Sequence, residues 1–150
     1  KNIKIAESHS KKSNLKINYI NTSPEKLNEN EKFDVILNLE IVEHVEDVDL
    51  YFKSCAKLLK KNGLMFTATL NRTFVSFIKA IIGAEYVLRW LPIGTHDWNK
   101  FLKPQEIENK ICNLNFSIKE VSGLKFNPFN QKWKRSKDLS VNYIITSVKN

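Results

Sequence analysis

A strand, a helix and a second strand follow one another in the first half of the chain, and this succession constrains the fold most. Phe33 to Leu39 is a nearly continuous apolar run, typical of a buried parallel strand. Apolar residues at helical spacing predict a helix from Val48 to Leu59, with Asp47 as its N-cap and Gly63 as its stop. Leu64 to Leu70 then alternates as a strand does. The pattern predicts an α/β fold with a doubly wound sheet.

The remaining elements are weaker, and the last two are expected to pair in antiparallel fashion at one end of the sheet. Pro104 is expected to begin a helix whose buried face is Ile107, Ile111 and Leu114. The other expected elements are a weak helix over Asn2 to Ser13, a short strand over Lys16 to Asn21, a helix start at Thr22-Ser23-Pro24, and closing strands over Phe116 to Val121 and Val141 to Val148, separated by a Lys-rich loop.

Composition excludes several classes of protein. The chain has 150 residues, 42% of them hydrophobic, which is enough for one domain with a core. Lys and Arg number 24 against 16 Asp and Glu, but only three are Arg, so the net charge of +8 does not predict nucleic-acid binding. No run of about 18 uncharged apolar residues could span a bilayer. Cys55 and Cys112 are expected to be reduced core thiols, which suits the cytoplasm.

An acidic segment follows the first strong strand, where ligands bind in open α/β sheets. Five of the 16 acids fall within residues 40–49. Glu40, Glu43 and His44 have i, i+3, i+4 spacing, so a helical turn would place them on one face, as a divalent-cation site requires. The alternative is a solvated acidic loop that complements the dipole of the next helix.

The apolar stretch from Phe74 to Leu91 follows the second strand. Its polar positions predict two short amphipathic helices kinked near Gly83, with Lys79 or the Glu85 to Arg89 pair facing water. Such helices fit either a lid on the domain or a segment in a membrane interface. The following His96 is expected to be structural rather than catalytic.

Taken together, these segments resemble the ubiquinone-biosynthesis O-methyltransferases, a family of class I S-adenosylmethionine-dependent methyltransferases. The resemblance extends over essentially all 150 residues. The blocks that carry it are Phe33-Asp34-Val35, Leu39-Glu40-Ile41-Val42-Glu43-His44-Val45, Thr69-Leu70-Asn71-Arg72, Gly83-Ala84-Glu85-Tyr86-Val87-Leu88-Arg89, Gly94-Thr95-His96-Asp97, Lys100-Phe101, Lys103-Pro104, Gly123-Leu124, Asn127-Pro128 and Val141-Asn142-Tyr143.

The resemblance implies a Rossmann-like methyltransferase sheet and methyl transfer from S-adenosylmethionine to a phenolic hydroxyl on a polyprenylated ubiquinone precursor. It implies that Leu39 lines the cofactor site and that Glu40, Glu43 and His44 hold a divalent cation, Mg or Zn. Residues 71–97 match the family's insertion, so the resemblance favours contact of residues 74–91 with an anionic membrane surface. The expected location is the cytoplasmic side of the inner membrane, with a ubiquinone-biosynthesis complex as a further partner.

Two mechanisms and two other functions stay open. The cation could lower the pKa of the acceptor hydroxyl, or His44 or His96 could act as general base without a metal. The chain could instead be a non-enzymatic module that binds anionic lipid, or a methyltransferase of the same fold for another hydroxylated acceptor.

The family's first strand, Gly-rich cofactor loop and ribose-binding acid have no counterpart here, and residue 1 is Lys. The chain is therefore expected to be the C-terminal part of one methyltransferase domain. Without the loop's amides, it is expected to bind S-adenosylmethionine poorly when isolated.

Overall fold

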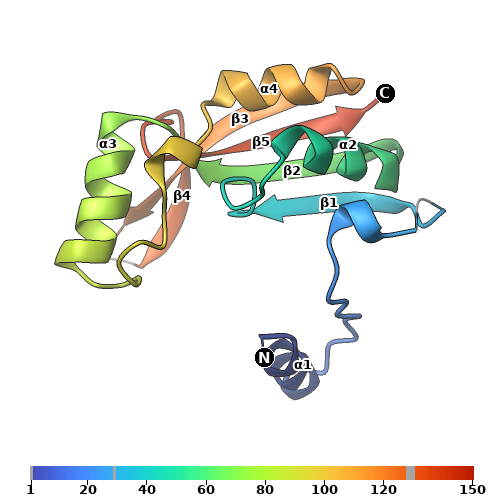
Figure 1. Cartoon of the computed structure of the whole chain (residues 1–150), viewed down its shortest axis with the longest axis horizontal. Helices are drawn as coiled ribbons and strands as arrows, with labels where there is room; N and C mark the ends of the chain where they lie inside the picture. Colours follow the sequence, from blue (N-terminus) through green and yellow to red (C-terminus); the bar gives the residue numbers. More distant parts are fainter. Residues whose placement is uncertain (1, 29, 128–130) are drawn as a thin grey trace.

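A computed structural model describes residues 2–28, 30–127 and 131–150, which form a mixed α/β sheet with helices (Figure 1). The strand order in the five-stranded sheet is β1-β2-β5-β3-β4. The strands are β1 (Phe33–Leu39), β2 (Leu59–Leu70), β3 (Phe116–Asn127), β4 (Lys132–Ser136) and β5 (Asn142–Lys149). The helical elements are α1 (Asn2–Lys12), η1 (Pro24–Lys26), α2 (Val48–Leu58), α3 (Phe74–Ser76), the π-helix η2 (Phe77–Val87), η3 (Trp98–Lys100) and α4 (Pro104–Cys112).

The predicted fold class is confirmed by the sheet topology. β1 and β2 are parallel and are connected through α2, as a β-α-β unit requires. β3 and β5 form the expected antiparallel pair, and β5 lies between β2 and β3. Because β5 runs antiparallel to both neighbours, the carboxyl ends of β1, β2 and β3 all lie at the same end of the sheet.

The core lies between the sheet and two helices on one of its faces. Phe52 of α2 and Ile107 of α4 are fully buried against Met65, Tyr143 and Ile145, which project from the same face of β2 and β5. Pro104 begins α4 as predicted, and Ile111 is fully buried. α1 lies away from the sheet (Figure 1).

β1 is parallel as predicted, but the expectation that it is buried is wrong. Ile36 and Asn38 face α2, whereas Leu37 and Leu39, on the other face, are 58% and 51% exposed. The reason is position, because β1 is the edge strand of the sheet and, within the described residues, a helix packs only on its face toward α2. The alternation of strand side chains then divides its apolar residues between the two faces.

The junction between α2 and β2 also differs from the prediction. Asp47 caps α2, its carboxylate accepting from the Leu50 N–H, but the helix ends at Leu58. The left-handed residue is Asn62, with φ 62°, rather than Gly63; it lies within β2, where the register of the ladder with β1 shifts. Gly63 is needed for space, since a Cβ there would lie 2.7 Å from Leu59 Cγ.

Three smaller expectations are wrong. Lys16 to Asn21 forms no strand, because it finds no ladder partner within the described residues. Cys112 is exposed at the end of α4, whereas Cys55 is buried as expected; both are free thiols. The Lys-rich loop contains β4, which forms a hairpin with an extended β3.

Candidate active site at the carboxyl end of the sheet

A tight turn, not a helix, follows β1. The Glu40 N–H donates to the Ala68 carbonyl at 2.9 Å, so the ladder with β2 extends one residue beyond the strand. Glu40 has φ 52°, and a turn closes from the His44 N–H to the Ile41 carbonyl at 2.8 Å. Glu40, Glu43 and His44 therefore do not share one face of a helical turn as predicted. The chain reverses instead, and the Glu43 side chain points into the protein.

Glu43 is a buried carboxylate, 3% exposed. Its Oε2 accepts a hydrogen bond of 2.7 Å from the Thr69 hydroxyl, near the end of β2. Its Oε1 is buried and has no hydrogen-bond partner among the described residues. Desolvation, and then the neighbouring Glu43 carboxyl, raise the pKa of Glu40 to about 8. The two carboxyl groups therefore form a pair with a strong tendency to hold a proton.

The three residues predicted to hold a cation do not converge. In the part of the chain that the structure describes, no group of three or more His, Cys, Asp and Glu side chains is arranged to hold a metal ion. The His44 ring instead stacks on the His96 ring, with centroids 6.1 Å apart and an interplanar angle of 29°. The chain reversal separates the donors that a regular helix would have grouped.

His96 forms a dyad with Glu85. Its Nδ1 lies 2.9 Å from Glu85 Oε1. Glu85 is 1% exposed, and its carboxylate also accepts from the N–H groups of Gly94 at 2.7 Å and His96 at 3.0 Å. Desolvation opposes ionisation, but these donors outweigh it and hold the pKa of Glu85 below its usual value.

The expectation that Glu85 faces water is therefore wrong. The helix carrying it packs this face against the loop at residues 94–96, which supplies the missing hydrogen-bond donors. Glu85 is the lone acid between Phe74 and Leu91, and this position in an apolar stretch was the sequence signal for its burial.

Residues 74–87 form one continuous helical segment, so the predicted kink at Gly83 is absent. Thr73 caps it: its hydroxyl accepts from the Ser76 N–H at 3.0 Å. Within residues 2–28, 30–127 and 131–150, no helix could cross a membrane. The inner side of the segment is held by Ile81, which packs with Leu70 and Phe101.

The outer side of this segment and the loop after it expose many large apolar side chains. Phe74 and Trp90 are 74% and 71% exposed. The other exposed ones are Val75, Phe77, Ile78, Ile82, Tyr86, Val87, Leu88, Leu91 and Ile93. Contiguous apolar surface of this kind marks a binding surface in a folded protein.

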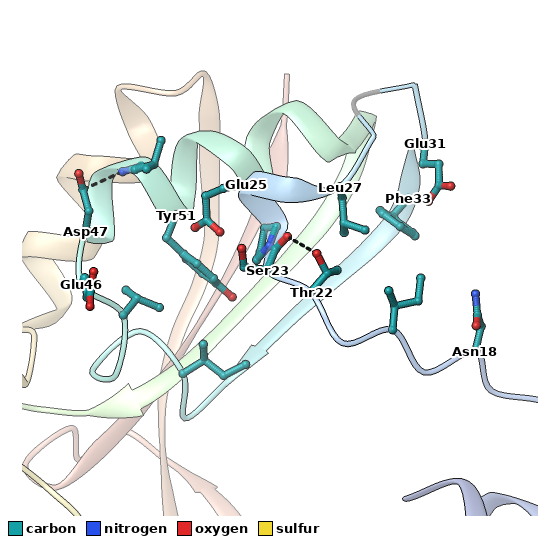
Figure 2. Close-up of a pocket in the computed structure, with 15 residues that line it drawn as sticks. Asn18, Thr22, Ser23, Glu25, Leu27, Glu31, Phe33, Glu46, Asp47 and Tyr51 are labelled. Carbon is teal, nitrogen blue, oxygen red and sulfur yellow. Dashed lines mark hydrogen bonds between the residues drawn. The ribbon is translucent and has the colours of Figure 1, made fainter. Parts of the chain in front are cut away.

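A cavity of about 830 Å³ lies on the other side of the turn, between α2 and the segment before β1 (Figure 2). Ile41 and Val45 of the turn line it, as do Tyr51 of α2 and Ser23 and Pro24 near η1. Leu39, the predicted cofactor-lining residue, lies outside this lining and exposes its side chain at the end of β1.

The chain is similar to known methyltransferases. The family described as Methyltransferase domain matches residues 1–67. The chain is 55% identical to the ubiquinone biosynthesis O-methyltransferase of Pelagibacter ubique (strain HTCC1062) over 150 residues, all of this chain and 62% of that protein. The chain thus resembles the ubiquinone biosynthesis O-methyltransferases over its whole length, and it spans less than two thirds of the length of that relative.

Solved structures share the fold of this chain at low sequence identity. An S-adenosylmethionine-dependent methyltransferase from Clostridium acetobutylicum ATCC 824 is 15% identical with a TM-score of 0.64, covering 99% of this chain and 71% of that one. A magnesium protoporphyrin IX methyltransferase from Synechocystis PCC 6803 with bound S-adenosylmethionine is 12% identical with a TM-score of 0.53, covering 90% and 47%. These likenesses confirm the Rossmann-like methyltransferase fold.

Sequence reasoning missed two buried polar residues near the candidate site. Thr69 holds Glu43, and Asn38 accepts from the Tyr51 hydroxyl at 2.9 Å beneath α2. Both residues occupy helix-facing positions of strands β2 and β1, where alternation alone predicts apolar residues. A polar residue at such a position was the available signal.

Proposed function

We propose that this chain carries the acceptor-facing part of an enzyme that methylates a phenolic hydroxyl on a polyprenylated ubiquinone precursor, with S-adenosylmethionine as methyl donor. The observation that carries the proposal is a site of two carboxyl groups and two imidazoles, at the carboxyl end of the sheet, in a chain 55% identical to a protein of that name. The bound S-adenosylmethionine named for a protein of the same fold supports the cofactor.

Methyl transfer requires little covalent chemistry from the protein. The phenolic oxygen attacks the methyl carbon of the sulfonium, the carbon–sulfur bond breaks, and the hydroxyl proton must leave. The protein must therefore align the oxygen with the methyl group and accept that proton.

His96 is the proton acceptor that the geometry favours. Its Nδ1 faces Glu85, which fixes the tautomer with Nδ1–H toward the carboxylate and leaves Nε2 as the basic atom. The buried, ionised Glu85 stabilises the imidazolium that forms. His44, stacked on His96, is the second candidate.

The divalent cation fits only part of the predicted ligand set. Glu40 and Glu43 offer carboxylate oxygens, and the unpaired Glu43 Oε1 is a buried atom suited to a ligand, but His44 does not converge with them. When bound, a cation would polarise the acceptor oxygens. Calorimetric titration with Mg²⁺ should give binding that Glu43→Gln abolishes and the exposed control Glu46→Gln retains.

The exposed outer side of residues 74–93 supports peripheral attachment to the inner membrane, where a polyprenyl tail is found. Apolar side chains in this arrangement insert at the headgroup boundary, and Tyr86 and Trp90 suit that depth. Leu39, exposed at the end of β1, remains the candidate for cofactor contact.

The test is transfer of a labelled methyl group from S-adenosylmethionine to a prenylated hydroxyphenol, measured in detergent with a full-length protein that contains this chain and its cofactor loop. His96→Asn should lower kcat by about 10²–10⁴-fold, the usual contribution of a general base, while the matched His9→Asn in α1 should not change it. Loss of activity on chelation would support the cation, and unchanged rates would refute it.

The acceptor decides between the alternatives. Equal rates with and without the prenyl tail would favour another hydroxylated acceptor. Absence of transfer to every acceptor by the full-length protein, with vesicle binding retained, would favour the non-enzymatic module.

A further inference from the structure

A second exposed surface lies on the hairpin of β3 and β4. Phe126 and Trp133 are directly opposite one another in the ladder between the two strands, and their ring centroids lie 5.2 Å apart. They are 42% and 61% exposed. A cross-strand aromatic pair stabilises a hairpin, but aromatic residues left open to water on an edge strand need a further explanation.

The same hairpin concentrates positive charge. Residues 124–138 carry five cations and one acid, a net charge of +4 and half of the chain's +8. Lys125 lies directly opposite Lys134, and Lys125 also pairs with Asp138 at 2.9 Å. Arg135 pairs with Glu120. Because like charges directly opposite one another are unfavourable, an anionic ligand would relieve the Lys125 to Lys134 pair.

Protection of an edge strand explains only part of this arrangement. Lysines on an edge strand discourage pairing with another chain. That function does not call for an exposed Trp in the same short strand. The alternation of the strands instead gives the hairpin one face with the aromatic pair and another with Lys125 and Lys134.

The hairpin lies at the same end of the sheet as α3 (Figure 1). β2 and β3 run in the same direction. The segment after β2 therefore leaves the sheet at the same end at which β3 pairs with β4. The exposed apolar residues 74–93 and the aromatic, basic hairpin therefore share that end. Gly123 helps to hold the hairpin base, because a Cβ there would lie 1.9 Å from the Asp138 carbonyl oxygen.

We propose that the β3–β4 hairpin is a second membrane-binding element, which inserts Phe126 and Trp133 at the headgroup boundary and holds anionic lipid headgroups through Lys125, Lys134 and Lys137. An apolar face combined with lysines on the polar face is what interfacial elements use, and long lysine side chains reach headgroups from that face. Single-stranded nucleic acid also binds aromatic and basic surfaces. The apolar segment at the same end favours the bilayer.

The test is co-sedimentation of the protein with vesicles of phosphatidylcholine alone and of phosphatidylcholine with phosphatidylglycerol. Lys134→Gln combined with Lys137→Gln should weaken binding to the anionic vesicles about 30-fold and leave binding to neutral vesicles unchanged. The matched control is Lys53→Gln with Lys119→Gln, which lowers the net charge equally at exposed positions outside the part of β3 that pairs with β4.

Phe126→Ser with Trp133→Ser should weaken binding to both kinds of vesicle, with folding checked by circular dichroism. The proposal is overturned if the control pair weakens binding as much as the hairpin pair, because attraction would then be a property of total charge. It is also overturned if the unsubstituted protein shows no preference for anionic vesicles, or if it binds single-stranded RNA more tightly than vesicles. Methyl transfer is not measured, so failure of the proposed activity would not affect the result.

Discussion

Glu40 and Glu43 illustrate how local backbone geometry changes the chemistry of a residue pair. On a regular helix, the two carboxylates would share a solvated face with His44. The left-handed Glu40 and the turn after it instead bury Glu43 against Thr69 and bring Glu40 close to it. Desolvation and the neighbouring carboxyl then favour the protonated form of Glu40.

The raised pKa of Glu40 predicts a pH dependence of stability. The pKa rises from the ordinary 4.5 to about 8 on folding, so between these values the folded protein binds more protons than the unfolded chain. The free energy of unfolding therefore falls as pH rises through this window. Because the side chain is partly solvated, Glu40→Gln should raise Tm by only about 2 °C above the window and leave it unchanged below.

The shift in Tm is measured by thermal unfolding of Glu40→Gln at pH values on both sides of the window. The exposed loop variant Glu46→Gln is the control. An equal shift for both variants would mean that the general acidity of the loop, rather than the carboxyl pair, controls stability.

At the level of elements, the helical segment from α3 through η2 is fixed from the inside by polar contacts and left apolar on the outside. The Trp98 indole donates to the Thr73 carbonyl at 3.0 Å, next to the N-cap of the segment. Near its other end, Glu85 accepts from the loop at residues 94–96. A buried carboxylate with several donors is costly to remove, because the donors lose their partner.

Glu85→Ala should therefore lower the free energy of unfolding by about 1–3 kcal/mol and release the loop that carries His96. Urea unfolding gives the stability, and amide hydrogen exchange at Gly94 and His96 gives the local effect. Lys79→Ala, on the exposed side of the same segment, should change stability by less than about 0.5 kcal/mol. Unchanged exchange at Gly94 in the Glu85 variant would contradict the prediction.

At the level of the whole molecule, the chemistry and the exposed apolar surface lie at one end of the sheet. The parallel strands bring the Glu40–Glu43 turn and the segment after β2 to that end, while α2 and α4 fill one face with the core. Under the proposed function, a lipid-borne acceptor would reach the site from this end.

The outer side of the segment should govern binding to uncharged membranes. Phe74→Ser with Trp90→Ser removes two of its most exposed apolar side chains. Binding to neutral phosphatidylcholine vesicles, measured by co-sedimentation, should fall at least tenfold. The reason is that burial of each apolar side chain contributes about 1.5–3 kcal/mol to the free energy of binding. Exposed Leu15→Ser and Ile17→Ser serve as the matched control; an equal loss in that control would contradict the prediction.

The sequence by itself determined the fold class, the parallel β1–α2–β2 unit, the start of α4 and the resemblance to ubiquinone biosynthesis O-methyltransferases. These features depend on periodicity, capping and contiguous motifs, which are local properties of the chain. Tertiary structure decided the exposure of β1, the burial of Glu85, the β4 hairpin and the separation of His44 from the carboxyl pair. Each of these depends on which surface a distant segment covers or on one backbone reversal, and neither is encoded in the spacing of neighbouring residues.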